Sequence, residues 1–185
     1  MTADDAFDDL ESIFGAAREE RRAEEEEYTR AAARQWARHR NLVDVVRELQ
    51  HRGDTISVQV GVIVFLGVVD AIGRDYVRLR TEGGRVDIRL ASSPSDQTPA
   101  PVLVRVVSRA RHGGRRAEAD APSFRARLLE YDGDEVEAVV GAPTVGAELR
   151  GCLVVGRDHV VVRDRDGGQT YVPLGCVAWV RPSRE

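Results

Sequence analysis

The sequence has no lysine, and all 27 of its basic residues are arginine. It has only two cysteines, Cys152 and Cys176, and aromatic residues make up 5% of the chain. Two cysteines cannot build the disulfide framework of a small secreted domain, and their spacing does not match the paired spacing of a zinc site. The sequence therefore argues against a disulfide-rich scaffold and a zinc finger, and we predict no metal site.

Long hydrophobic runs are also missing. No apolar run approaches the roughly 20 residues that a membrane-spanning helix needs. The first residues are acidic, and no basic region precedes an apolar segment there, as it would in a secretory signal. We therefore expect a cytoplasmic protein that does not associate with a membrane.

The common motifs of catalysis do not occur. There is no Gly-x-Ser-x-Gly, His-Glu-x-x-His, Walker or Gly-x-Gly-x-x-Gly sequence. The four histidines are scattered, and no nucleophile, base and orienting group come together in the sequence. We therefore predict that the protein is not an enzyme and needs no cofactor.

Two stretches of the chain follow one pattern. Residues 73–90 begin Gly-Arg-Asp-Tyr and break at Gly83-Gly84, and residues 156–174 begin Gly-Arg-Asp-His and break at Gly167-Gly168. Alternating apolar and polar residues on both sides of a glycine turn predict a half-buried β-hairpin. In the first hairpin we expect the alternate side chains Val77, Leu79, Val86, Ile88 and Leu90 to point into a core. Their neighbours should then point outward: Arg78, Arg80, Arg85, Asp87 and Arg89.

Helical segments flank the hairpins. Residues 16–52 are rich in Ala, Glu and Arg and favour one long helix, whose apolar side chains Trp36, Val43, Val46 and Leu49 should dock on the first β unit. The expected domains are an acidic flexible segment (1–15), this charged helix (16–52), a first β unit (53–108), an Arg-rich linker (109–122) and a second β unit with a short helix (123–185).

Two segments resemble motifs of the Sm-like family of small β-barrels. Residues 67–79, from Gly67-Val68-Val69 to Val77-Arg78-Leu79, resemble the first Sm motif, and residues 172–177 resemble the second more weakly. The resemblance implies a mainly β, α+β protein. Its two tandem five-stranded barrels, of the Sm or SH3-like kind, would each follow a helix.

The RNA pocket of that family is not matched. Sm-like RNA pockets have an Asn in the turn after the second strand and an Arg-Gly pair before the last strand. Here the turns carry Tyr76 and His159, and Leu174 precedes Gly175. The resemblance therefore implies the fold and does not supply the binding residues.

Charge favours a nucleic-acid ligand for the body of the protein. Residues 1–30 hold eleven acids and four Arg, so the remainder carries 20 acids and 23 Arg. A slightly basic body with Arg on outer faces suits single-stranded RNA, with Tyr76 and His159 stacking on bases. The candidate binding residues are Tyr76, Arg78, Arg80, Arg85, Arg89, Arg111, Arg115, Arg116, His159 and Arg163.

Two other functions stay open at this point. Phe7, Leu10, Ile13 and Phe14 share one face of an acidic helix, which suits docking into a partner's groove, so the chain could be a protein–protein adaptor. A structural protein without a nucleic-acid ligand is the third alternative. The sequence does not decide the oligomeric state.

Overall fold

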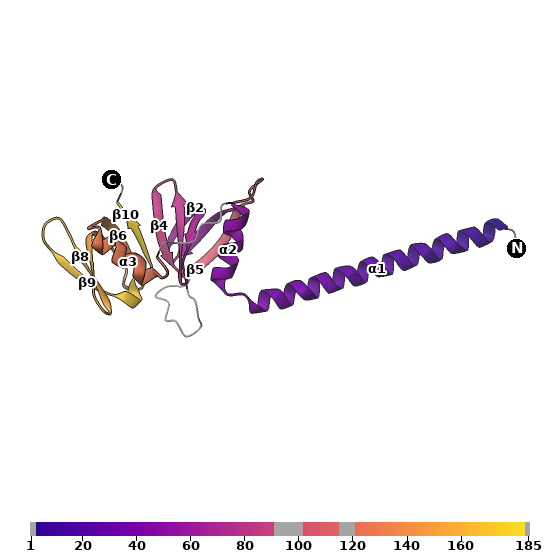
Figure 1. Ribbon diagram of the computed structural model, residues 1–185, viewed down its shortest axis with the longest axis horizontal. Helices are drawn as coiled ribbons and strands as arrows, with labels where there is room; N and C mark the ends of the chain where they lie inside the picture. The colour runs from indigo at the N-terminus through magenta and orange to yellow at the C-terminus, as the bar shows by residue number, and fades with distance from the viewer. Residues whose placement is uncertain (1–2, 91–101, 115–120, 184–185) are drawn as a thin grey trace. The chain divides into compact units, whose positions relative to one another are not determined.

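The computed structural model describes residues 3–90, 102–114 and 121–183, without the side chains of 3–18, 33 and 37. Contacts divide the chain into two units, Met1–Arg40 and Asn41–Glu185. The first unit contains helix α1 (Ala3–His39), and the second contains every other helix and strand assigned to the described residues (Figure 1). The domain boundaries expected from the sequence stay predictions.

Helix α1 ends where the next helix is capped. The Asn41 side chain accepts a hydrogen bond from the Asp44 backbone at 2.9 Å, and the Asp44 side chain accepts one from the Asn41 backbone at 3.2 Å. This reciprocal pair is a capping box, which starts α2 (Leu42–Arg52). The sequence predicted one helix through residue 52, but the cap interrupts it at Asn41.

Helix α2 packs against the sheet through one face. Val43, Val46 and Leu49 are buried there, and Gly53 ends the helix in the left-handed region at φ 75°. Trp36, which was predicted to pack with them, lies in α1 of the first unit, and its docking on the sheet stays a prediction. The Arg40 guanidinium covers the Trp36 ring at 4.1 Å from its centre.

Within the described part of the chain, ten strands form one antiparallel sheet, in the order β5-β1-β2-β3-β4-β10-β6-β7-β8-β9. The strands of the first half are β1 (Thr55–Val60), β2 (Ile63–Ile72), β3 (Tyr76–Thr81), β4 (Gly84–Arg89) and β5 (Val102–Ser108). Helix α3 (Phe124–Gly133) precedes the second half, in which single turns η1 (Pro143–Val145) and η2 (Leu174–Cys176) join strands. Those strands are β6 (Glu137–Ala142), β7 (Ala147–Val155), β8 (His159–Arg163), β9 (Gln169–Pro173) and β10 (Trp179–Pro182).

The predicted pair of Sm-like barrels is wrong. Strand β4 pairs with β3 on one side and with β10 on the other, where Ile88 faces Trp179 and Asp87 faces Val180. Because β10 comes from the end of the chain, this pairing joins the two halves into one open sheet with β5 and β9 at its ends. The coarser prediction, a mainly β protein of the α+β class, is confirmed.

The first five strands and the last five are ordered alike, as β5-β1-β2-β3-β4 and β10-β6-β7-β8-β9. Their hairpins also close in the same way. The backbone N–H of Leu90 donates to the Asp75 carbonyl at 2.7 Å, and that of Leu174 donates to the Asp158 carbonyl at 2.8 Å. Residues of one half can therefore be matched to residues of the other by their pairing.

Each half places an aromatic side chain in the core of the other. Trp179 of β10 packs edge-on against Phe65 of β2, with ring centres 5.1 Å apart, in the core under α2. Tyr76 of β3 lies 6.2 Å from Phe124 of α3, in the core of the second half. Both side chains are fully buried, so the halves of the sheet stabilise one another.

Candidate functional site

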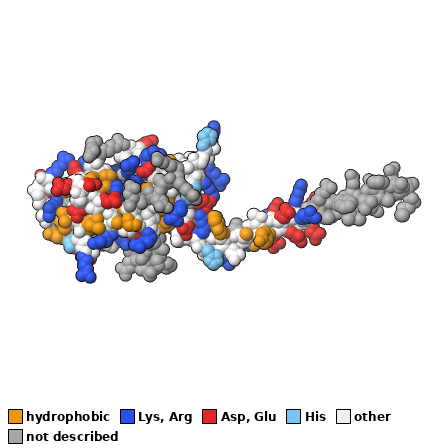
Figure 2. All heavy atoms as spheres, in the orientation of Figure 1, with side chains coloured by type: hydrophobic (Ala, Val, Ile, Leu, Met, Phe, Trp, Pro, Cys, Tyr) orange, Lys and Arg blue, Asp and Glu red, His pale blue; other side chains and the backbone are white. Residues whose placement is uncertain are grey.

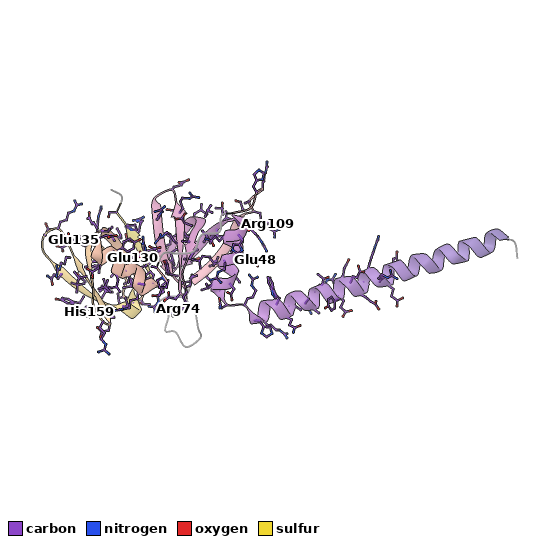
Figure 3. The ribbon with its side chains drawn as sticks, viewed as in Figure 1. Glu48, Arg74, Arg109, Glu130, Glu135 and His159 are labelled. Carbon is purple, nitrogen blue, oxygen red and sulfur yellow. The ribbon has the colours of Figure 1, made fainter. Side chains whose placement is uncertain are left out.

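A buried polar cluster lies where the halves meet. Asp87 of β4 accepts hydrogen bonds from Arg78 of β3 at 2.8 Å, from Arg127 of α3 at 3.1 Å and from the Tyr131 hydroxyl at 2.5 Å. Arg127 also contacts the Glu130 carboxylate, and its guanidinium lies 4.3 Å from the centre of the Tyr131 ring. The Asp87 carboxylate therefore binds two guanidinium groups and one hydroxyl. Glu130, which lies on α3 in this cluster, is labelled in Figure 3.

Burial and Asp87 set the protonation of this cluster. Desolvation by burial, with the charge of Asp87 next, raises the pKa of Tyr76 to about 12. The same two causes raise the pKa of Tyr131. Burial alone would lower the pKa of Arg78, but its ion pair with Asp87 raises it overall. Both tyrosines therefore stay neutral hydrogen-bond donors, and the cluster is suited to joining α3 to the sheet.

The burial of these side chains shows that the predictions for two binding residues, Tyr76 and Arg78, are wrong. Arg78 and Asp87 were expected to point outward, but α3 covers that face of β3 and β4 and buries both side chains. Tyr76 was expected to stack on a base, but it is fully buried and its hydroxyl donates to the Ala121 carbonyl at 3.0 Å. Neither Tyr76 nor Arg78 presents a surface to a ligand in this structure.

Of the other predicted arginines, the structure brings together Arg80 and Arg85, which are exposed and face each other on β3 and β4. Arg85 is exposed and pairs with Asp70 at 3.3 Å, while Arg89 is half-buried and donates to the Leu174 carbonyl at 3.3 Å. Arg80 lines a cleft of about 250 Å³ together with Asp70 and His112. The remaining described candidates, Arg111 and Arg163, are exposed on the loop after β5 and at the end of β8.

The structure gives no side-chain account of six predicted positions. Arg115 and Arg116 lie outside the described residues. The four apolar positions of the predicted docking face lie within α1, and their side chains are not among those described: Phe7, Leu10, Ile13 and Phe14. Docking through this segment stays a prediction.

His159 lies beside an exposed aromatic residue that the sequence analysis did not select. The ring centres of His159 and Tyr171 are 5.8 Å apart, and Tyr171 is 65% exposed on the edge strand β9. The His159 ring contacts the Asp158 carboxylate at 2.8 Å, and this hydrogen bond lowers the pKa of Asp158. Exposed Arg163 lies on the same strand as His159, which is labelled in Figure 3.

The opposite end of the sheet carries an apolar surface. Val64 and Leu103 flank Gln59 of β1 in register, and Leu66 and Arg105 flank Ser57 in the next row. Val64 is 58% exposed, Leu66 is 53% exposed and Leu103 is 62% exposed. We call Val64, Leu66 and Leu103 the outer patch. Its three side chains lie on the face away from the core residues of these strands, and the polar residues Ser57 and Gln59 of β1 lie between β2 and β5 on that face.

The outer patch was missed because its strands look like core strands. Residues 62–72 read as a long apolar strand, and an apolar run of this kind is typical of burial on both faces. The signal that could have found the patch is the partner strand β1, which alternates strictly and places Ser57 and Gln59 on one face. Residues paired with those polar positions on either side must share their exposed face.

The second unit has no excess of positive charge. Seven of the 27 arginines and eleven of the 31 acids precede Asn41, so Asn41–Glu185 carries 20 of each. Figure 2 shows acidic and basic side chains interspersed on the visible face of this unit. Mixed charge of this kind does not provide the basic surface that nucleic-acid binding relies on.

The described residues offer neither a membrane-spanning helix nor a metal-binding cluster. Among the described helices, none is long and apolar enough to cross a membrane. Within the described ranges, no group of three His, Cys, Asp or Glu residues could hold a metal ion. No protein-family model matches the sequence, and no curated protein matches it either.

Proposed function

We propose that the protein is a non-enzymatic protein–protein interaction module that contacts its partner through the outer patch. The proposal is supported by the exposure of Val64 and Leu66 on β2 and of Leu103 on β5, all on the same face of the sheet. An apolar surface on an otherwise well-packed sheet is typical of a contact site for another protein. The neutral charge of Asn41–Glu185 supports the same reading over a nucleic-acid ligand.

The proposal is tested by co-purification from cells that produce the protein. Leu66→Lys places a charge in the outer patch, on the same strand as Val64, without disturbing a buried side chain. We expect at least a tenfold loss of a specific set of co-purified proteins, measured by quantitative mass spectrometry. The matched control is Arg163→Glu, which alters an exposed residue on β8 and should leave that set unchanged. Equal recovery with wild type and Leu66→Lys would contradict the proposal.

A second candidate function is binding of single-stranded RNA at the other end of the sheet. It is favoured by the exposed ring pair His159–Tyr171 with Arg163 on the same strand, because bases stack on aromatic residues that lie on a sheet surface. The acidic residues 1–30 would compete with RNA for such a site.

Gel-shift titration with a 20-nucleotide oligouridylate would test this candidate. Deleting residues 1–30 should tighten binding, and Tyr171→Ala should weaken it by roughly tenfold, in keeping with about 1–3 kcal/mol per stacked base. The control Arg105→Glu changes an arginine at the far end of the sheet and should have little effect. Absence of binding by the truncated protein at low salt would eliminate RNA as a ligand.

A further inference from the structure

The joint between the halves shows how an edge strand of this sheet accepts another strand. Strand β10 takes β4 in antiparallel pairing, with Ile88 facing Trp179 and Asp87 facing Val180. One further hydrogen bond extends the joint, from the Arg89 backbone N–H to the Ala178 carbonyl at 2.8 Å. The strand that enters thus needs a free backbone N–H at the position of Arg89.

Strand β5 is the counterpart of β10. Ile56 faces Gly67 as Ala138 faces Gly151, so β1 corresponds to β6. Val104 faces Val58 on β1, and Val180 faces Val140 on β6. Val58 lies two residues after Ile56, and Val140 lies two residues after Ala138. Their partners therefore correspond, so Val104 matches Val180 and Leu103 matches Trp179.

Unlike β10, β5 has no strand on its second side. It lies at the end of the sheet, and within the described residues no strand pairs with its outer edge. Its surface is also unusually apolar for an edge, since Leu103, Val106 and Val107 are all exposed. An edge of this composition is a template for pairing with another strand.

Strand β9 is the counterpart of β4, but it cannot make the same joint. Pro173 faces His159 as Arg89 faces Tyr76, so Pro173 stands where Arg89 stands. Proline has no backbone N–H and cannot supply the hydrogen bond that Arg89 donates. A second copy of the chain therefore lacks the donor needed to place its β9 on β5.

Two copies of the chain could also associate by pairing their β5 strands, but the charge of Arg105 disfavours this arrangement. If two β5 strands pair around a two-fold axis near Val104 or Arg105, the two Arg105 side chains lie opposite or diagonal to each other. Like charges directly opposite each other in an antiparallel pair are destabilising, and long side chains such as arginine also reach their diagonal neighbours. Both edges that the chain could offer to itself are thus unfavourable partners for β5.

We propose that β5 accepts an antiparallel strand from a different protein. This inference rests on the proposed function and names the partner's chemistry. The partner supplies an extended segment with a backbone N–H at the position of Arg89, an apolar residue beside Leu103 as Ile88 lies beside Trp179, and an acidic residue close to Arg105. Pro173 keeps the chain's own β9 from occupying this edge.

The first test restores the missing donor. Pro173 is exposed, so Pro173→Arg can give β9 the N–H and the side chain of β4 without changing the core. Light scattering at about 100 µM, a concentration at which weak association is detectable, should show a monomer for the wild-type protein. The Pro173→Arg protein should show a mass that rises with concentration. Adding Leu103→Lys to Pro173→Arg should return the mass to that of a monomer. A monomeric Pro173→Arg protein would overturn the role of Pro173, and a wild-type oligomer abolished by Leu103→Lys would make a second copy the occupant.

The second test supplies a strand directly. The probe is a capped peptide that copies residues 84–90, titrated into the full-length ¹⁵N-labelled protein. We expect shifts of the Val102–Val106 amide signals, with affinity lowered at least tenfold by Leu103→Lys in the protein. The matched control is the same peptide with proline at the position of Arg89, which should bind at least tenfold more weakly. Absence of shifts in β5, or equal binding of both peptides, would overturn the proposal.

The two proposals can fail separately. If co-purified proteins depend on Leu66 but neither test detects pairing at β5, the outer patch binds a partner by its face and the strand proposal is wrong. If β5 pairs with the peptide but Leu66→Lys changes no co-purified protein, the edge accepts a strand and the proposed surface is wrong.

Discussion

The carboxylate of Asp87 lies in the interior between the sheet and α3, where it pairs with Arg78 and Arg127. The pattern of β3 and β4 correctly placed Val77, Leu79, Val86 and Ile88 in the core. It also placed Asp87 in solvent, because alternation assumes that only one face is covered. Helix α3 covers the second face with Arg127 and Tyr131, and no local feature of residues 84–90 encodes a helix that begins 34 residues later.

Removing the carboxylate of Asp87 should strongly destabilise the protein. Asp87→Ala leaves Arg78 and Arg127 without their buried counter-ion, and breaking a buried pair in this way costs about 3–5 kcal/mol. The free energy of unfolding can be measured by urea denaturation. Asp70→Ala, which removes a partly exposed partner of Arg85, is the control and should cost less than about 1 kcal/mol. Similar losses for the two variants would contradict the role of the cluster.

The raised pKa values of Tyr76 and Tyr131 predict a loss of stability at alkaline pH. The folded state favours their neutral phenols, so this stability is complete below the ordinary tyrosine pKa of 10.0 and is lost as pH rises towards about 12. Melting temperatures followed by circular dichroism should fall steeply over that interval. Tyr76→Phe should flatten the fall, although it also loses the hydrogen bond to Ala121. An unchanged pH profile in Tyr76→Phe would contradict the assignment.

At the scale of elements, local signals were reliable and distant pairings were not. Glycine turns within alternating residues predicted the hairpins β3–β4 and β8–β9, and both are present. The joint between β4 and β10 was not predictable, because it brings together Ile88 and Trp179, which are 91 positions apart. The outer patch depends on which strands become neighbours, so it was hidden for the same reason.

Helix α2 provides the sharpest test at this scale. Val46 is fully buried against the sheet, and Val45, the next residue, is 37% exposed. Val46→Asp should cost several kcal/mol because it buries an unpaired carboxylate. Val45→Asp has the same chemistry on the outer side of the helix and should change stability by roughly 0.5 kcal/mol. Comparable thermal shifts in both variants would show that the helix is not docked as described.

At the scale of the whole molecule, the arrangement of the sheet separates two kinds of surface. The end at β5 is apolar and, within the described residues, has an unpaired edge. The end at β9 carries Tyr171, and Pro173 there lacks the backbone N–H that pairing with a further strand would use. The sequence predicted the mainly β, α+β class of the fold. It could not predict that the two ends of the sheet differ. This difference arises because β4 pairs with β10 in the middle of the sheet, which leaves β5 and β9 as its two end strands.

Site-specific photo-cross-linking in the cells that produce the protein is the most direct test of whether the outer patch contacts another protein. A photoreactive residue is placed at Leu103 in the outer patch or, in a second protein, at Tyr171 on β9, since both positions are exposed. We predict a discrete protein adduct from position 103, lost when Leu66→Lys is added, and no comparable protein adduct from position 171. RNA adducts from position 171, with no protein adduct from position 103, would contradict the account.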